Sequence, residues 1–127
     1  MAIIVKKFGG SSVSSIDKIK QIADLISIDL KDGDDIVVVV SAMGKTTNDL
    51  FNLAYEITKT PNQREMDMLV TAGERITMTL LSLCLQQLNI QSISFTGSQC
   101  GIITDNSHGN AKILTINLTA PWSAIQC

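Results

Sequence analysis

Residues 3–13 read Ile-Ile-Val-Lys-Lys-Phe-Gly-Gly-Ser-Ser-Val, an apolar run that leads through lysine into paired glycines and two hydroxyl side chains. The apolar residues predict a strand over 3–8, and the helical pattern after Ser14 predicts that the turn opens a helix. Paired glycines leave N–H groups free to point at a ligand, Lys7 adds a positive charge, and the following helix would offer the positive end of its dipole. The stretch therefore suits phosphate, although a plain strand-to-helix turn explains it equally well.

Strands and helices alternate along the rest of the chain. Apolar residues recur at helical spacing over 16–30, and Ser14 with Asp17 forms a weak capping box. Ile36–Val40 is an unbroken apolar run, typical of a strand covered on both faces. Further helices are predicted over 50–57 and 65–88, with Gly73 interrupting the second, and further strands over 90–95, 102–104 and 113–116. This alternation predicts right-handed βαβ units and a mainly parallel sheet.

Polar loops follow three of the predicted strands, at residues 7–12, 41–47 and 96–101. Because ligands bind at the carboxyl ends of strands in such sheets, we expect the three loops to gather at one edge and form a small-molecule site. The second loop ends in Gly44-Lys45-Thr46, which looks like the end of a P-loop. A P-loop needs a glycine five positions before Gly44, where this chain has Val39, so that interpretation fails.

Glu74 is an unusual carboxylate because it follows Gly73 within a mostly apolar helical pattern. It either pairs with Arg75 or another neighbour, or meets an amine on a ligand. The residues alone favour the structural pairing. Glu65 and Asp67 read as solvated residues near the start of the same helix.

Composition narrows the function classes for these 127 residues, which make one ordinary domain. A net charge of −2, with one Trp, one Tyr and three Phe, argues against a nucleic-acid binder. The three cysteines have no metal-ligand spacing with the single histidine, His108, and are interpreted as reduced thiols. No signal peptide and no apolar stretch of about 18 residues is visible, so we expect a cytoplasmic protein without membrane association.

Four segments together resemble the signatures of aspartate kinases, in the order and spacing of that family. They are KFGGSSV at 7–13, VVVVSAMGKTTNDL at 37–50, REMDMLVTAGE at 64–74 and TGSQCGIITDNSHGNAK at 96–112. The resemblance covers about residues 3–116. It implies an α/β fold, a three-layer αβα sandwich with a mainly parallel sheet, of which residues 1–119 form the N-terminal half. Residues 120–127 match nothing in the family and form an unrecognised tail.

The resemblance also implies an activity, the transfer of the ATP γ-phosphoryl group to L-aspartate. The products are 4-phospho-L-aspartate and ADP, at the start of lysine (diaminopimelate), threonine and methionine synthesis. The implied ATP contacts are Lys7, Phe8, Gly9, Gly10 and Ser41, with Lys7 as the catalytic charge. The implied aspartate contacts are Thr47 and Glu74, the latter for the α-amino group. Mg²⁺ would be carried by the nucleotide, with no metal ligand from the protein, and His108 is interpreted as structural.

The sequence departs from the family at Ser98, where relatives have tryptophan, at Cys100, where they have a small residue, and at its end. Relatives continue through a further half of the kinase domain, which carries most of the adenine pocket, and then through regulatory ACT modules. We therefore expect the isolated chain to be inactive and to self-associate or form a homo-oligomer. Two alternatives stay open, namely a non-catalytic module that binds aspartate or phosphate, and a dimerisation or interaction fragment.

Overall fold

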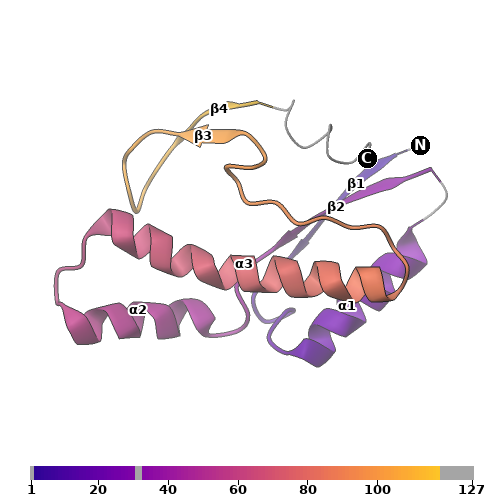
Figure 1. Cartoon of the computed structure of the whole chain (residues 1–127), viewed down its shortest axis with the longest axis horizontal. Coiled ribbons are helices and arrows are strands. Elements are labelled where there is room, and N and C mark those ends of the chain that lie inside the picture. Colours follow the sequence, from indigo (N-terminus) through magenta and orange to yellow (C-terminus); the bar gives the residue numbers. More distant parts are fainter. Residues whose placement is uncertain (1, 31–32, 118–127) are drawn as a thin grey trace.

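The structure is a computed structural model that describes residues 2–30 and 33–117, so the predicted tail at 120–127 lies outside the described residues (Figure 1). Its elements, in chain order, are β1 (Ile3–Phe8), α1 (Ile16–Asp29), β2 (Asp35–Val40), α2 (Thr46–Ile57), α3 (Gln63–Gln87), β3 (Ile102–Thr104) and β4 (Ile113–Ile116). Helices and strands alternate over the first part of the chain, which confirms the α/β class.

β1 and β2 are parallel neighbours, as the sequence predicted. They pair in register from Ile3 opposite Asp35 to Phe8 opposite Val40. The crossover between them is α1, whose first turn is capped by Ser15, which accepts a hydrogen bond from the Lys18 N–H at 3.3 Å. The predicted cap was Ser14, one residue earlier, which instead donates its hydroxyl to the Ser11 carbonyl at 3.0 Å.

One face of this two-stranded sheet is covered by α1 and α3, which pack against each other; α3 passes in front of the strands in Figure 1. Period-2 alternation turns every second strand residue toward the helices. The buried core consists of Val13, Ile19, Ile22, Ala23, Ile26, Leu81 and Leu85, with Phe8, Ile36, Val38 and Val40 packed against it from the two strands. Burial of these side chains provides the main driving force that holds the unit together.

The other face of the sheet is open within the described part of the chain. Ile3 and Val5 of β1, and Val37 and Val39 of β2, point away from the helices, and Val5 is 66% exposed. The apolar run at 36–40 therefore has a covered and an uncovered side here, although its composition predicted cover on both. An apolar face of this kind suits contact with further protein.

The predicted strand over 90–95 is wrong. Within the described residues the segment pairs with no strand, and its polar groups bind α3 instead. The Ser92 hydroxyl donates to the Ser82 carbonyl at 3.0 Å, and the Gln86 amide donates to the Ser92 carbonyl at 3.0 Å. β3 and β4 form an antiparallel hairpin that stands apart from the parallel pair.

Two helices differ in extent from their predictions. α2 begins at Thr46 rather than at residue 50, because the polar residues after Lys45 form its first turn. α3 runs unbroken through Gly73. Glycine is accepted there because the helix backbone lies close to Ala42 at that position.

α3 is also the one helix of the described residues that is long and apolar enough to cross a membrane, with a mean hydropathy of 1.4 over 18 residues. The sequence predicted no such stretch. Length and composition are weak evidence, because the central helix of a globular protein satisfies the same test. α3 carries Glu74 and Arg75 near its middle and packs against α1, α2 and β2, and 22% of its apolar window is buried in the described structure.

Two isoleucines of α1 test this packing. Ile19 is fully buried and Ile28 is 77% exposed. Ile19→Ala should lower the free energy of unfolding by about 2–5 kcal/mol, because it removes buried methyl groups and leaves a cavity. Ile28→Ala on the same helix should change it by less than about 0.5 kcal/mol. Urea unfolding measures both, and equal losses would show that α1 is not packed on the sheet as described.

Candidate functional site

The loops that follow β1 and β2 meet at the carboxyl edge of the sheet, as the sequence predicted. The Gly44 N–H donates to the Gly10 carbonyl at 3.0 Å, and the Ser41 N–H donates to the Phe8 carbonyl at 3.2 Å. A Cβ on Gly10 would lie 3.0 Å from the Ala42 carbonyl oxygen, so a side chain there would push the loops apart. Glycine at this position allows the two backbones to touch.

The first loop presents several unused hydrogen-bond donors. Its turn is closed by the Ser12 N–H on the Gly9 carbonyl at 3.0 Å and by the Val13 N–H on the Gly10 carbonyl at 3.3 Å. Within the described residues, the N–H groups of Gly9, Gly10 and Ser11 donate to no acceptor. Successive free N–H groups in a turn form a concavity that suits an anion.

A helix end adds to these donors, but it belongs to α2 rather than to α1. α1 and α3 are capped by the side chains of Ser15 and Asn62, whereas Lys45 at the start of α2 makes no capping hydrogen bond. The Thr47 and Asn48 N–H groups donate to no described acceptor. The α2 end, with the partial positive charge of its dipole, therefore faces the glycine loop uncapped.

The two lysines of β1 are held differently because alternate residues face opposite ways. Lys6 lies on the helix side and forms an ion pair with Asp29 of α1. The Lys7 side chain is exposed at the end of the strand and makes no hydrogen bond or ion pair with any described residue. Its charge is thus available at the mouth of the glycine loop. Phe8, also predicted as an ATP contact, packs its ring against the core, so only its backbone faces the site.

α3 reaches the same place through Gly73, which is buried. A Cβ on Gly73 would lie 2.8 Å from the Ala42 Cβ and 3.4 Å from the Thr46 Cγ2. The residues next to these contacts are Glu74 on α3 and Thr47 on α2, so the fold brings the two predicted aspartate contacts to one region. This contact also explains why a helix interior accepts glycine here.

Glu74 is half-buried and lacks the partner that the sequence favoured. The ion pairs of the described residues are Lys6–Asp29, Arg64–Glu65 and His108–Asp67, and none includes Glu74 or Arg75. A carboxylate that is partly removed from water without a cation is a candidate for binding a ligand cation.

The third predicted loop, at 96–101, is not joined to the other two. Its turn is closed internally by the Cys100 N–H on the Thr96 carbonyl at 2.9 Å, and the Gly101 carbonyl accepts from the Asn117 N–H at 2.8 Å. It therefore leads into the β3–β4 hairpin. The expectation failed here because residues 90–95 do not enter the sheet.

The loop between β3 and β4, at 105–112, contains contacts that the sequence did not reveal. Asp105 accepts from the N–H groups of Ser107 and Lys112, each at 3.1 Å, and these hydrogen bonds hold the pKa of the Asp105 carboxyl below its usual value. Asp67 of α3 accepts from the Gly109 N–H at 2.9 Å and lies 3.3 Å from the His108 Nδ1. Asp67 had been interpreted as a solvated surface residue. Its spacing of seven from Glu74, which places both on one helix face, was the available signal.

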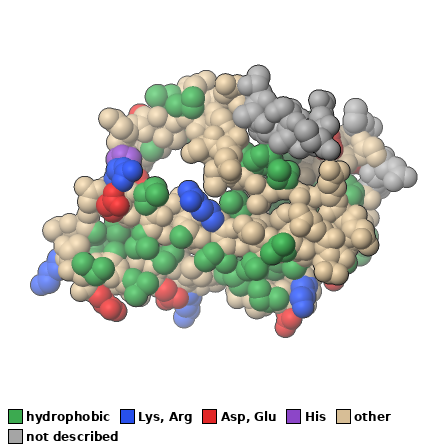
Figure 2. All heavy atoms as spheres, viewed as in Figure 1, with side chains coloured by type: hydrophobic (Ala, Val, Ile, Leu, Met, Phe, Trp, Pro, Cys, Tyr) green, Lys and Arg blue, Asp and Glu red, His purple; other side chains and the backbone are tan. Residues whose placement is uncertain are grey.

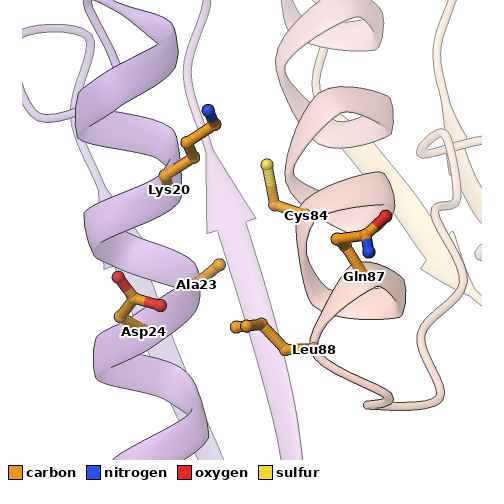
Figure 3. Close-up of a pocket in the computed structure, with 6 residues that line it drawn as sticks. All are labelled: Lys20, Ala23, Asp24, Cys84, Gln87 and Leu88. Atoms are coloured by element: carbon orange, nitrogen blue, oxygen red, sulfur yellow. The ribbon is translucent and has the colours of Figure 1, made fainter.

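A pocket of about 220 Å³ lies elsewhere, between α1 and the second half of α3 (Figure 3). It is lined by Lys20, Ala23, Asp24, Cys84, Gln87 and Leu88. None of the predicted site residues lines it, and it is smaller than most ligand sites. The described residues contain no group of three His, Cys, Asp or Glu side chains that could hold a metal ion, and Cys84 and Cys100 are unpaired thiols.

Known proteins resemble this chain in sequence. The chain is 52% identical to an aspartokinase of Mycolicibacterium smegmatis over 116 residues, covering 91% of this chain and 28% of that protein. It is 49% identical to an aspartokinase of Geobacillus stearothermophilus, covering 94% of this chain and 29% of that protein. The chain thus spans less than a third of the length of these curated relatives.

Solved structures give the same result for the fold. An aspartate kinase from Synechocystis superposes with a TM-score of 0.75 at 48% identity, covering 79% of this chain and 17% of that one. Aspartokinase III of E. coli, in complex with aspartate and ADP, superposes with a TM-score of 0.71 at 20% identity, covering 87% of this chain and 34% of that one. The profile of the amino acid kinase family matches residues 2–121, nearly the whole sequence, and the chain therefore belongs to the amino acid kinase family.

Proposed function

We propose that this chain supplies the phosphate-binding edge and part of the aspartate pocket of an aspartokinase, which converts ATP and L-aspartate to ADP and 4-phospho-L-aspartate. One observation carries the proposal: a set of unused donors and an unpaired carboxylate lie at the same edge of the sheet. The donors are the N–H groups at 9–11, the uncapped α2 end and Lys7, and the carboxylate is Glu74. The relatives at about 50% identity bear the name aspartokinase.

On the phosphate side, this arrangement suits a polyphosphate. The Gly9 and Gly10 N–H groups and the α2 end would bind phosphoryl oxygens, and Ser41 at the end of β2 would add a hydroxyl. Lys7 would meet the negative charge that grows on the transferring group. Mg²⁺ would enter with the nucleotide and neutralise phosphate charge.

On the acceptor side, Glu74 would accept hydrogen bonds from the α-ammonium group of L-aspartate, and Thr47 would bind the substrate through its hydroxyl. The β-carboxylate of aspartate is already ionised at neutral pH, so the attack needs no general base. Catalysis then reduces to alignment and to charge neutralisation. This chemistry accounts for a site built without histidine or a carboxylate dyad.

The catalytic role of Lys7 has a matched control in its neighbour. In an active kinase that carries these residues, Lys7→Ala should lower kcat by about 10²–10³, because contacts made with transition-state charge are worth about 3–4 kcal/mol. The KM for aspartate should change far less. Lys6→Ala, which removes the lysine paired with Asp29, should leave kcat within about twofold. Steady-state kinetics measures both variants. A loss of kcat below about threefold for Lys7→Ala would show that this lysine has no catalytic role.

The role of Glu74 is separable from that of the phosphate loop. Glu74→Gln in the same kinase should weaken L-aspartate binding about tenfold or more, since the amide cannot supply the charge that pairs with an ammonium group. ATP binding should stay nearly unchanged. Isothermal titration with each ligand measures this, with Glu65→Gln as a control on the exposed face of α3. Equal losses for the two ligands would point to a structural role for Glu74.

The open sheet generates a prediction for the 127-residue polypeptide on its own. Each strand of the parallel pair has one neighbour within the described residues, and unpaired edges and apolar faces promote self-association. We expect no measurable aspartokinase activity in a coupled ADP-release assay, because the chain supplies only part of the site. We also expect oligomers in sedimentation velocity. Turnover at an ordinary kinase rate would contradict the first expectation, and a monodisperse monomer would contradict the second.

A further inference from the structure

The β3–β4 hairpin contacts the start of α3 at one well-defined place. Asp67, in the second turn of α3, accepts from the Gly109 N–H at 2.9 Å and faces the His108 Nδ1 at 3.3 Å. Beside it, a Cβ on Gly109 would lie 2.6 Å from the Gln63 Oε1, and Gly109 has a φ of +78°. The turn at 108–109 therefore lies directly on the helix, in a conformation that favours glycine.

The loop that carries this turn is internally ordered. Asp105 binds the N–H groups of Ser107 and Lys112, and the Asn110 N–H donates to the Ser107 carbonyl at 3.0 Å. A loop braced in this way moves as a unit. Its attachment to Asp67 consequently fixes the position of the whole segment at 105–112 relative to α3.

The attached loop shares a face of α3 with Glu74. Residues seven apart lie on the same side of a helix, and the rise of 1.5 Å per residue separates Asp67 from Glu74 by about 10 Å along the axis. Gly73, one residue away, presses against Ala42 at the mouth of the glycine loop. The space-filling view shows an opening between the hairpin and α3 (Figure 2). Along the axis of α3, the Glu74 face thus runs from the hairpin contact to the level at which Gly73 meets Ala42.

We propose that Asp67 is a positioning residue for the acceptor substrate: it holds the loop at 105–112 over the face of α3 that carries Glu74, and so forms one wall of the aspartate site. The proposal rests on the function proposed above. It assigns to Asp67 no contact with aspartate or ATP. Its effect acts through the Gly109 N–H and the His108 ring.

The first arm of the test measures amide hydrogen exchange over residues 105–112 in the full chain. It reports whether Asp67 holds this loop on α3. Asp67→Ala should raise exchange of the loop by about fivefold, the expected scale for a partly exposed charged contact. Asp67→Asn keeps an oxygen that can accept from the Gly109 N–H, so it should restore part of the protection. Glu65→Gln, on the same helix but paired with Arg64, should leave the loop unchanged. Equal exchange in Asp67→Ala and the wild type would overturn the proposal.

The second arm measures substrate binding, by titrating L-aspartate and, separately, MgADP into an active kinase that carries these residues and into its Asp67 variants. Asp67→Ala should raise the Kd for L-aspartate at least threefold and leave the Kd for MgADP within about twofold, with Asp67→Asn in between. Loosened exchange with an unchanged Kd for L-aspartate would overturn the positioning role, as would equal losses for both ligands. A wild-type kinase that binds no L-aspartate would overturn the proposed function and this role with it, and the exchange arm tells that outcome apart from a failed attachment.

Discussion

Three backbones come close together around Ala42, and the rest of the arrangement depends on that contact. Gly10 approaches the Ala42 carbonyl from the β1 loop, and Gly73 approaches the Ala42 side chain from α3. A side chain on either glycine would separate the loops from each other or from the helix. Because Ala42 is buried between them, the glycine turn, the start of α2 and the middle of α3 are held at one edge of the sheet.

The polar groups near this contact divide into those used for structure and those left unused. Lys6 is paired with Asp29, and α1 and α3 have side-chain caps. Lys7, the N–H groups at 9–11 and the α2 end have no partner among the described residues. Proteins satisfy most of their polar groups, so a cluster of unused donors beside an unpaired carboxylate is the chemical signature of a binding site. The division is consistent with the proposed function, in which these groups bind phosphate and an amino group.

The sheet and the hairpin also differ in how much of their surface packs against the helices. The sheet buries one face against α1 and α3 and leaves Ile3, Val5, Val37 and Val39 uncovered. The hairpin contacts α3 through a short polar turn. Such a polar contact can set the position of a loop while adding little to global stability. The buried core therefore supports the proposed phosphate edge, and the polar contact with the hairpin supports the proposed acceptor wall.

The sequence by itself determined the parallel β1–β2 pair, the three helices, the two strands of the hairpin and the meeting of the first two loops. These features follow from local periodicity and from the rule that parallel strands end at a common edge. The tertiary structure alone decided that residues 90–95 bind α3 instead of joining the sheet, that α2 rather than α1 offers an uncapped end, and that Glu74 lacks Arg75 as a partner. It also decided the attachment of His108 and Gly109 to Asp67. These features depend on contacts between residues distant in the chain, or on which of several partners takes a hydrogen bond. The spacing of neighbouring residues encodes neither long-range contacts nor that choice of partner.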